Sequence, residues 1–392
     1  MKGTNHCIVS IGHVLLLLIL LASHFAISSP AHADAGLPPI STGADSYNVV
    51  VNPVTNKVYA ANLTSGNVTI IDGATEQVLA TLPVGTTPLG MAVNTVTNKV
   101  YVACGGAGRV YVISGASDAV LTDIAVGGNP VAVAVNPVTN RIYVANAASD
   151  TVSVINGATD SVMATVPTDD GPLALAVNPV TNRIYVANNP STRLTVIDGA
   201  TNAPSPITIG TGAMAVAIHV ARNRIYVVAA IGSPRVVSID GTTGTPITIA
   251  LPAGAAPASL AINPATDHLY VANAGNDTVT VIRTDTNVIA ATINLPAGAQ
   301  PVSVAVNAAA NKVYTANSGD SNVTVINGVT NTVITTISGY PKASALAVNP
   351  LTHKVFVACA NPGAGRVGVL DGTTHAPFTY ASGGTVTSGH CP

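Results

Sequence analysis

The side chains with the clearest capacity for chemistry are two adjacent acids, Asp169 and Asp170, in a Thr-Asp-Asp-Gly-Pro segment. Gly and Pro in such a cluster are typical of a loop. A hard cation such as Ca²⁺ prefers carboxylate oxygens and takes several of them. Asp169 and Asp170 are therefore the best candidates for contact with a calcium ion, and the interpretation that we favour over it is a solvated acidic loop. Asp150, Asp277 and Asp320 stand at related positions of the repeat described below and could contribute.

Other catalytic chemistry has little support in the sequence. His219, His268 and His353 fall in one recurring type of turn and are spaced far apart, so we interpret them as surface residues and not as a metal site. The chain contains no Gly-x-Ser-x-Gly elbow, no Cys-x-x-Cys pair and no Gly-x-x-x-x-Gly-Lys phosphate loop. We predict no catalytic residue, and no cofactor other than the calcium ion.

The elements that must position these residues repeat along the chain. Segment 135–146, Val-Asn-Pro-Val-Thr-Asn-Arg-Ile-Tyr-Val-Ala-Asn, returns nearly unchanged as 177–188, which begins 42 residues later. A fixed period of this length indicates a repeat architecture. Following the tyrosine of this unit gives eight copies, with phenylalanine in the last. The positions are Tyr59, Tyr101, Tyr143, Tyr185, Tyr226, Tyr270, Tyr314 and Phe356.

Each copy contains four short apolar runs, for example 131–135, 141–145, 151–155 and 161–166. Runs rich in Val, Ile and Tyr that end in Asn-Pro or Asn/Asp-Gly predict strands joined by hairpins. A four-stranded unit that recurs at this period matches the blade of a propeller. We predict an all-β protein, a β-propeller of eight four-stranded blades, with seven blades as the alternative.

The two ends of such a ring must meet, because an open outer edge exposes unpaired backbone groups. Residues 376–381 could complete the last blade, or residues 37–41 could add a strand from the other end of the chain. The sequence favours neither solution.

The repeated pattern Val-Asn-Pro-x-Thr-Asn-[Lys/Arg]-x-Tyr-Val-Ala-Asn, followed by Val-Ile-Asp-Gly-Ala-Thr, resembles the YVTN family of β-propeller repeats. That family occurs in secreted and surface-layer proteins of prokaryotes. The resemblance covers nearly all of the chain after its N-terminal segment. It implies a fold and a location but no single activity. Copies five to eight depart from the pattern, as at His219 and Arg283, and mark either a specialised sector or drift.

The N-terminal segment, residues 1–33, has the features of a secretory signal peptide. It carries one basic residue, Lys2, then an apolar run, and ends in Ala31-His32-Ala33. The run is interrupted by Ser-His and is too short for a membrane anchor. We predict removal of this segment and export of residues 34–392, a single propeller domain with a short C-terminal tail, to the periplasm or the cell surface.

Composition excludes some partners. Loss of Lys2 moves the formal net charge from −2 to about −3, and the chain has no tryptophan. Single-stranded nucleic acid is bound in basic grooves lined with aromatic side chains. We therefore predict no nucleic-acid partner and no membrane span. In an oxidising compartment Cys391, on the C-terminal tail, could form a disulfide with Cys359, which leaves Cys104 as a buried thiol.

These observations favour a monomeric, non-enzymatic binding module or cell-envelope scaffold, whose partner is an unknown envelope component or protein. The alternative is a propeller enzyme of the lactonase or dehydrogenase-subunit type, with its site at the central opening. That alternative requires at least three ionisable residues gathered at the opening.

Overall fold

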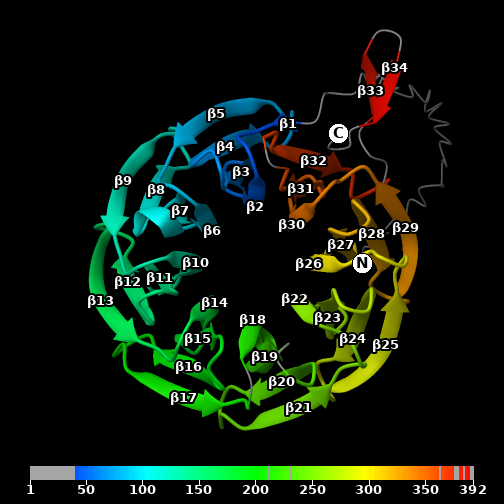
Figure 1. Ribbon diagram of the computed structural model, residues 1–392. Helices are drawn as coiled ribbons and strands as arrows, with labels where there is room; N and C mark the ends of the chain where they lie inside the picture. Colours follow the sequence, from blue (N-terminus) through cyan, green and yellow to red (C-terminus); the bar gives the residue numbers. More distant parts are fainter. Residues whose placement is uncertain are drawn as a thin grey trace, which may run out of the picture. The chain divides into compact units, whose positions relative to one another are not determined.

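The computed structural model describes residues 40–374, apart from 211, 230, 231 and 362, together with the backbone of residues 379–382 and 385–388. Within this part of the chain, eight antiparallel four-stranded sheets follow one another around a ring, and one further two-stranded hairpin is formed (Figure 1). The prediction of an all-β propeller with eight blades is confirmed, and the seven-bladed alternative is wrong. The predicted signal peptide, residues 1–33, lies outside the described residues.

The strands form where β-branched and aromatic side chains concentrate, and they end where the backbone must turn. In blade 3, Ile142, Tyr143 and Val144 are fully buried in β11 (Arg141–Asn146). The turn before this strand ends in Asn140, whose φ is 50°. Asparagine tolerates this left-handed conformation, because its short polar side chain bonds locally. The equivalent residue has a positive φ in every blade. These residues are Asn56, Asn98, Asn140, Asn182, Asn223, Asp267, Asn311 and His353.

Blades 1 to 4 are built from consecutive strands. Blade 1 contains β2 (Ser46–Asn52), β3 (Lys57–Asn62), β4 (Asn67–Asp72) and β5 (Val78–Pro83). Blade 2 contains β6 (Pro88–Asn94), β7 (Lys99–Cys104), β8 (Arg109–Ser114) and β9 (Val120–Ala125), with the 3₁₀ turn η1 (Gly105–Ala107). Blade 3 contains β10 (Pro130–Asn136), β11, β12 (Thr151–Asn156) and β13 (Ser161–Pro167). Blade 4 contains β14 (Pro172–Asn178), β15 (Arg183–Asn188), β16 (Arg193–Asp198) and β17 (Pro204–Thr208).

The remaining blades follow the same plan until the last. Blade 5 contains β18 (Ala213–His219), the 3₁₀ turn η2 (Val220–Arg222), β19 (Arg224–Ala229), β20 (Arg235–Asp240) and β21 (Pro246–Ala250). Blade 6 contains β22 (Pro257–Asn263), β23 (His268–Asn273), β24 (Thr278–Arg283) and β25 (Val288–Asn294). Blade 7 contains β26 (Pro301–Asn307), β27 (Lys312–Asn317), β28 (Asn322–Asn327) and β29 (Thr332–Ser338). Blade 8 contains β30 (Ala343–Val348), β31 (Val355–Cys359), β32 (Arg366–Leu370) and β1 (Ile40–Ser41), and the hairpin pairs β33 (Thr379–Ser382) with β34 (Thr385–Ser388).

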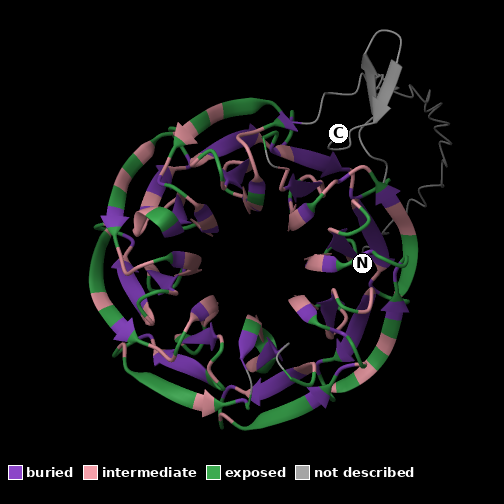
Figure 2. Ribbon diagram, viewed as in Figure 1, coloured by how far each residue is buried: buried purple, intermediate pink, exposed green. Residues whose placement is uncertain are grey.

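The first strand of each full blade lies nearest the centre of the ring and the fourth lies on its circumference (Figure 1). Each first strand contacts the first strands of both neighbours, and β30 contacts β2, which completes the circle. Buried residues concentrate in the second and third strands (Figure 2). We call the edge that carries the turns between strands one and two, and between three and four, the first rim. The other connections form the second rim.

The ring is closed by the N-terminal end of the chain. Strand β1 pairs antiparallel with β32, with Ile40 opposite Val367 and Ser41 opposite Arg366. Of the two predicted closures, the addition of residues 37–41 is therefore confirmed for its described residues, 40 and 41. Residues 379–382 pair with 385–388 instead of completing blade 8.

The outermost strands are protected against pairing with another chain, which an exposed sheet edge invites. In blades 1, 2, 3, 6 and 7 a β-bulge interrupts the pairing of the third and fourth strands. In blades 4 and 5 proline takes this role: Pro204 and Pro206 stand in β17 and Pro246 in β21. Proline has no N–H to offer to a neighbouring strand.

The side chain at the end of each first strand, or directly after it in blade 8, reaches the first turn of the next blade, a contact that we call the inter-blade clasp. In blade 1, Nδ2 of Asn52 donates to Oδ1 of Asn98 at 2.7 Å, and Oδ1 of Asn52 accepts from the N–H of Val54 at 3.0 Å. Both ends of this buried amide are thus satisfied. Six joints use two asparagines. They are Asn52–Asn98, Asn94–Asn140, Asn136–Asn182, Asn178–Asn223, Asn263–Asn311 and Asn349–Asn56.

Ion pairs cross several of the same joints. Lys57 of blade 1 lies 2.7 Å from Asp118 of blade 2, and the joint between blades 8 and 1 has Lys354 at 2.6 Å from Glu76. Glu76 is the only glutamate of the chain and is 6% exposed. A carboxylate that is buried and paired in this way serves the closure of the ring.

Gly73→Ala is expected to loosen the joint between blades 8 and 1. An added Cβ would lie 2.6 Å from the carbonyl oxygen of Asn56 and 2.7 Å from Nδ2 of Asn349, too close for any packing arrangement. We expect the free energy of unfolding, measured with urea, to fall by about 1–3 kcal/mol, the usual cost of overpacking. Gly128→Ala is the control, because its Cβ would meet nothing nearer than Oγ of Ser149 at 3.2 Å. Equal stability of the two variants would contradict this account of the joint.

Candidate functional site

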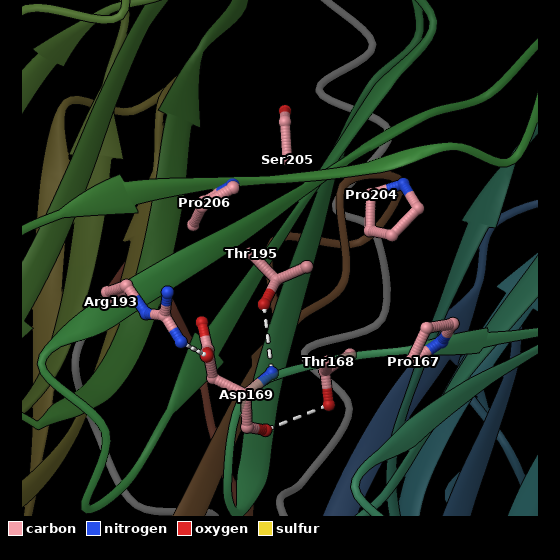
Figure 3. Close-up of a pocket in the computed structure, with 8 residues that line it drawn as sticks. All are labelled: Pro167, Thr168, Asp169, Arg193, Thr195, Pro204, Ser205 and Pro206. Carbon is pink, nitrogen blue, oxygen red and sulfur yellow. Dashed lines mark hydrogen bonds and ion pairs between the residues drawn. The ribbon is translucent and has the colours of Figure 1, made fainter.

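The predicted calcium contact lies on the second rim, in a cavity of about 240 Å³ between blades 3 and 4. Arg193 of β16 points toward Asp169 and forms an ion pair with its carboxylate (Figure 3). The backbone N–H of Asp169 donates to Oγ1 of Thr195 at 3.3 Å. The Asp169 side chain is 15% exposed, so this carboxylate already has a cationic partner within the protein.

The other candidate acidic side chains do not gather around a common centre. Asp170 is exposed. Asp150 accepts from the N–H of Gly171 at 2.8 Å, and Asp277 accepts from the N–H of Gly298 at 2.7 Å, so both hold loops that lead to the next blade. Across the described residues, no three acidic, histidine or cysteine side chains form a group that could hold a metal ion. The calcium contact stays a prediction.

A recurring asparagine at the end of the second strand has a structural use. Nδ2 of Asn146 donates to Oγ1 of Thr151 at 3.1 Å and to Oγ of Ser153 at 3.0 Å, both in the third strand of its own blade. Asparagines in four other blades bond their third strands in the same way. They are Asn62, Asn188, Asn273 and Asn317. These amides fasten the sheet and do not converge on a ligand.

Cysteine replaces this asparagine in blades 2 and 8. Cys104 is a free, fully buried thiol, as predicted, and burial raises its pKa to about 12. A thiol with so high a pKa is unreactive near neutral pH. Cys359 is disulfide-bonded. The predicted partner, Cys391, lies outside the described residues, so that pairing stays a prediction.

The first rim holds a group of side chains that the predictions from sequence did not include. His219 is 4% exposed, so its interpretation as a surface residue is wrong. Its Nε2 lies 3.0 Å from Oδ1 of Asp267, in the next blade. Nδ2 of Asn307 lies 3.2 Å from Nδ1 of His353. These two contacts are the clasps between blades 5 and 6 and between blades 7 and 8, so histidine stands in for asparagine in the ring.

Arg222 completes the group around Asp267. Its Nε and Nη2 donate to the two carboxylate oxygens at 2.9 Å and 2.6 Å. The hydrogen bonds from Arg222 outweigh the effect of burial and, with that from His219, hold the pKa of the Asp267 carboxyl well below its usual range. Asp267 is therefore ionised at neutral pH and accepts the Nε2–H of His219. In the neutral ring, Nδ1 is then the acceptor.

A cavity of about 450 Å³ lies beside this histidine; we call it the blade 5–6 cavity. It is lined by Ile218, His219, Val220 and Ala221 of blade 5 and by Ile262 and Pro264 of blade 6. Ile218 and Ile262 stand on the innermost strands, β18 and β22, which places the cavity at the inner end of the first rim. Apart from His219, every lining side chain is apolar.

The sequence did contain a signal for this group. An intact clasp joins asparagines 46 residues apart, as in Asn52 and Asn98. In copies five and six both asparagines are replaced, by His219 and by Asp267, which stand 48 residues apart. Two replacements of the repeated asparagines, separated by the spacing of a clasp, indicate that the new residues contact each other. Each replacement taken alone looks like a substitution in a surface turn.

Comparison with known proteins identifies the fold and no family. No family model matches the sequence. No curated protein matches it. Among solved structures, hydrazine synthase from Kuenenia stuttgartiensis aligns with a TM-score of 0.60 and 20% identity, over 74% of this chain and 97% of that one. Dihydro-heme d1 dehydrogenase NirN, in complex with DHE, aligns with a TM-score of 0.70 and 15% identity, over 83% of this chain and 73% of that one. At such identities the likeness shows the β-propeller fold alone.

The described residues contain no helix long and apolar enough to cross a membrane.

Proposed function

We propose that the protein is an exported, non-enzymatic binding module of the YVTN-repeat kind that serves as a scaffold in the cell envelope. The observation that carries this proposal is a row of exposed aliphatic side chains on the first rim, the aliphatic arc. Its members lie in the first turns of five consecutive blades, 8 and 1 to 4, and are 54–77% exposed. They are Leu351, Val54, Val96, Val138 and Val180.

The arc favours binding because exposed aliphatic side chains that recur at one position on neighbouring blades offer a partner several apolar contacts along the same rim. Many polar side chains of the same rim are used in the clasps, in ion pairs between blades, or in bonds to their own turns, as in Asp72 and Asp198. The equivalent turns of blades 5, 6 and 7 carry Ala221, Ala265 and Ala309. At this turn position, exposed branched aliphatic side chains therefore stand on five consecutive blades and alanine on the other three.

Co-sedimentation with isolated envelopes of the source organism tests this proposal. The full chain, exported and processed by its host, is expected to sediment with envelopes at low and at high salt. The double variant Val138→Asp and Val180→Asp should lose most of this binding while remaining folded, because both positions are exposed. The double variant Asp169→Asn and Asp170→Asn, on the second rim, should bind as the unaltered protein does in the absence of Ca²⁺.

The same assay separates the two rims. If Ca²⁺ increases sedimentation of the unaltered protein and not of the Asp169→Asn, Asp170→Asn variant, the predicted calcium contact is supported. A protein that stays wholly soluble under all conditions would overturn the scaffold proposal. If the Val138→Asp, Val180→Asp variant still binds envelopes, the aliphatic arc is not the contact surface.

The second candidate function is an enzyme with its site at the central opening. The group that favours it is His219, Arg222 and Asp267 beside the blade 5–6 cavity, since three ionisable residues gather there. Two proteins that share the fold carry the names of enzymes. Hydrolysis of a panel of lactones tests this candidate. Turnover that is lost in His219→Asn would replace the scaffold proposal.

A further inference from the structure

We propose that the blade 5–6 cavity binds a small uncharged molecule with an apolar body and one hydrogen-bond donor, such as an aliphatic alcohol or a phenol. The site is separate from the aliphatic arc, which ends at blade 4, and does not depend on envelope binding. The two proposals can therefore fail independently.

The size and walls of the cavity define the body of the ligand. Its volume of about 450 Å³ falls within the range of small-molecule sites in proteins. Ile218, Val220 and Ala221 form one wall, and Ile262 and Pro264 form the other. A charged group placed against these apolar walls would lose hydration at a large cost, because Arg222, the nearest cation, is already paired with Asp267. An apolar body gains free energy from the same burial.

The one polar side chain that lines the cavity, that of His219, defines the head of the ligand. Nε2 of His219 is held by Asp267, which is fixed in turn by the two hydrogen bonds from Arg222. Nδ1 of His219 makes no hydrogen bond within the part of the chain that the structure describes. Because Nε2 carries the proton of the neutral ring, Nδ1 offers a lone pair, and a hydroxyl of the ligand can donate to it.

The contact between two blades does not by itself require an imidazole with an unbonded Nδ1. In the joint between blades 4 and 5, Asn178 uses both ends of its amide, with Nδ2 on Asn223 at 2.9 Å and Oδ1 accepting from the N–H of Val180 at 3.1 Å. In blade 5 the turn is the 3₁₀ turn η2, which takes no hydrogen bond from the His219 side chain.

Three positions depart from the repeat together here. His219, Arg222 and Asp267 stand where the repeat has Asn, Thr and Asn. Two amides fasten six other joints, and in the joint between blades 7 and 8 His353 meets Asn307. The imidazole that is held by a carboxylate and an arginine beside an apolar cavity is the feature that fastening does not explain.

Methyl NMR of the full chain, labelled at isoleucine, tests the site with 1-hexanol as the probe and hexanoate as its charged counterpart. Hexanol is expected to shift the methyl signals of Ile218 and Ile262 and to leave that of Ile113, in the core of blade 2, unchanged. At pH 8, hexanoate should bind at least tenfold more weakly. Equal affinity for the two probes, or no selective shift of the two cavity methyls, overturns the proposal.

Two variants test separately the walls of the cavity and the hydrogen bond from the ligand's hydroxyl to His219. Ala221→Leu adds bulk to the cavity wall without touching the clasp and should weaken hexanol binding at least tenfold. The double variant His219→Asn and Asp267→Asn rebuilds the amide clasp of the other joints and removes the imidazole. It should melt within a few degrees of the unaltered protein and bind hexanol about five- to tenfold more weakly, the loss of one neutral hydrogen bond.

Thermal melting is measured before each titration. If Ala221→Leu does not fold, the double variant still decides the question, because its clasp has a natural counterpart in Asn178–Asn223. An unchanged dissociation constant in a folded Ala221→Leu variant overturns the cavity as the binding site. An unchanged constant in the double variant overturns the assignment of His219 to the ligand's hydroxyl.

Discussion

Raising the pH from 10 to 12 is expected to unfold the protein in a single cooperative step, with tyrosine ionisation and loss of sheet structure occurring together. Seven tyrosines stand at the repeated position between the blades, and each is at most 1% exposed. Burial raises the pKa of Tyr59, Tyr270 and Tyr314 to about 12. These hydroxyls must therefore stay protonated for as long as the blades remain packed.

The direction in which stability changes with pH follows from the linkage between protonation and folding. A tyrosine ionises near 10 in the unfolded chain but only near 12 in the folded one, so the folded state binds the proton more tightly. The stabilisation is complete below pH 10 and is lost as the pH rises to 12. Each such tyrosine contributes roughly 3 kcal/mol. Three of them together approach the whole stability of a typical domain, about 5–15 kcal/mol.

Absorbance at 295 nm and circular dichroism, recorded through one alkaline titration, provide the measurement. The two signals should change at the same pH. Tyrosine ionisation that begins near pH 10 while the sheet signal persists would contradict the burial of these side chains.

Phenylalanine variants supply the control, because blade 8 already has Phe356 at this position. The hydroxyls of Tyr59, Tyr143 and Tyr185 are buried and have no hydrogen-bond partner among the described residues. Replacing all three by phenylalanine should raise the pH of unfolding and cost little at pH 7. Tyr270→Phe differs, because its hydroxyl donates to the carbonyl of Gly328 at 3.1 Å. That variant should lose about 1 kcal/mol at pH 7.

The strands and their number could be predicted because the information is local and repeated. The apolar run of a strand, its Asn-Pro or Asn-Gly ending and the period of 42 residues between Tyr101 and Tyr143 are all visible in one copy and its neighbour. Eight copies of one four-stranded unit leave few architectures to consider. Cys104 as a buried thiol followed from the same alignment of copies, because it stands where the repeat has a buried asparagine.

The candidate sites could not be predicted in the same way, because they depend on which blade lies beside which. Arg193 and Asp169 belong to different segments of the second rim, and only the packed ring brings them into an ion pair. His219 meets Asp267 across a joint between blades. The size of the cavity beside His219 depends on the distance between β18 and β22, which no pattern of residues in either strand encodes.

The second large effect is expected where the ring closes, on replacing Ile40 by alanine. Ile40 is 5% exposed and packs in one cluster with Val49, Phe356 and Val367. It is one of only two residues in β1, so it supplies most of the buried surface of that strand. We expect the free energy of unfolding to fall by about 2–4 kcal/mol, the range for removing a buried isoleucine side chain.

The other blades contain a matched control for this variant. Ile293 is opposite Val279 in blade 6, as Ile40 is opposite Val367 in blade 8, and it is 6% exposed. Ile293→Ala should cost a similar amount. It should not free its strand, because β25 pairs with β24 at six positions whereas β1 pairs with β32 at two.

Hydrogen exchange distinguishes the two variants. With Ile40→Ala, β1 is expected to leave β32, so that amides in residues 366–370 exchange faster while those of blade 6 are unchanged. With Ile293→Ala the acceleration should stay within blade 6. If Ile40→Ala altered neither the exchange of residues 366–370 nor the stability, closure by the N-terminal strand would be wrong. The joint would then depend on the remaining links between blades 8 and 1, the Asn349–Asn56 clasp and the Lys354–Glu76 ion pair.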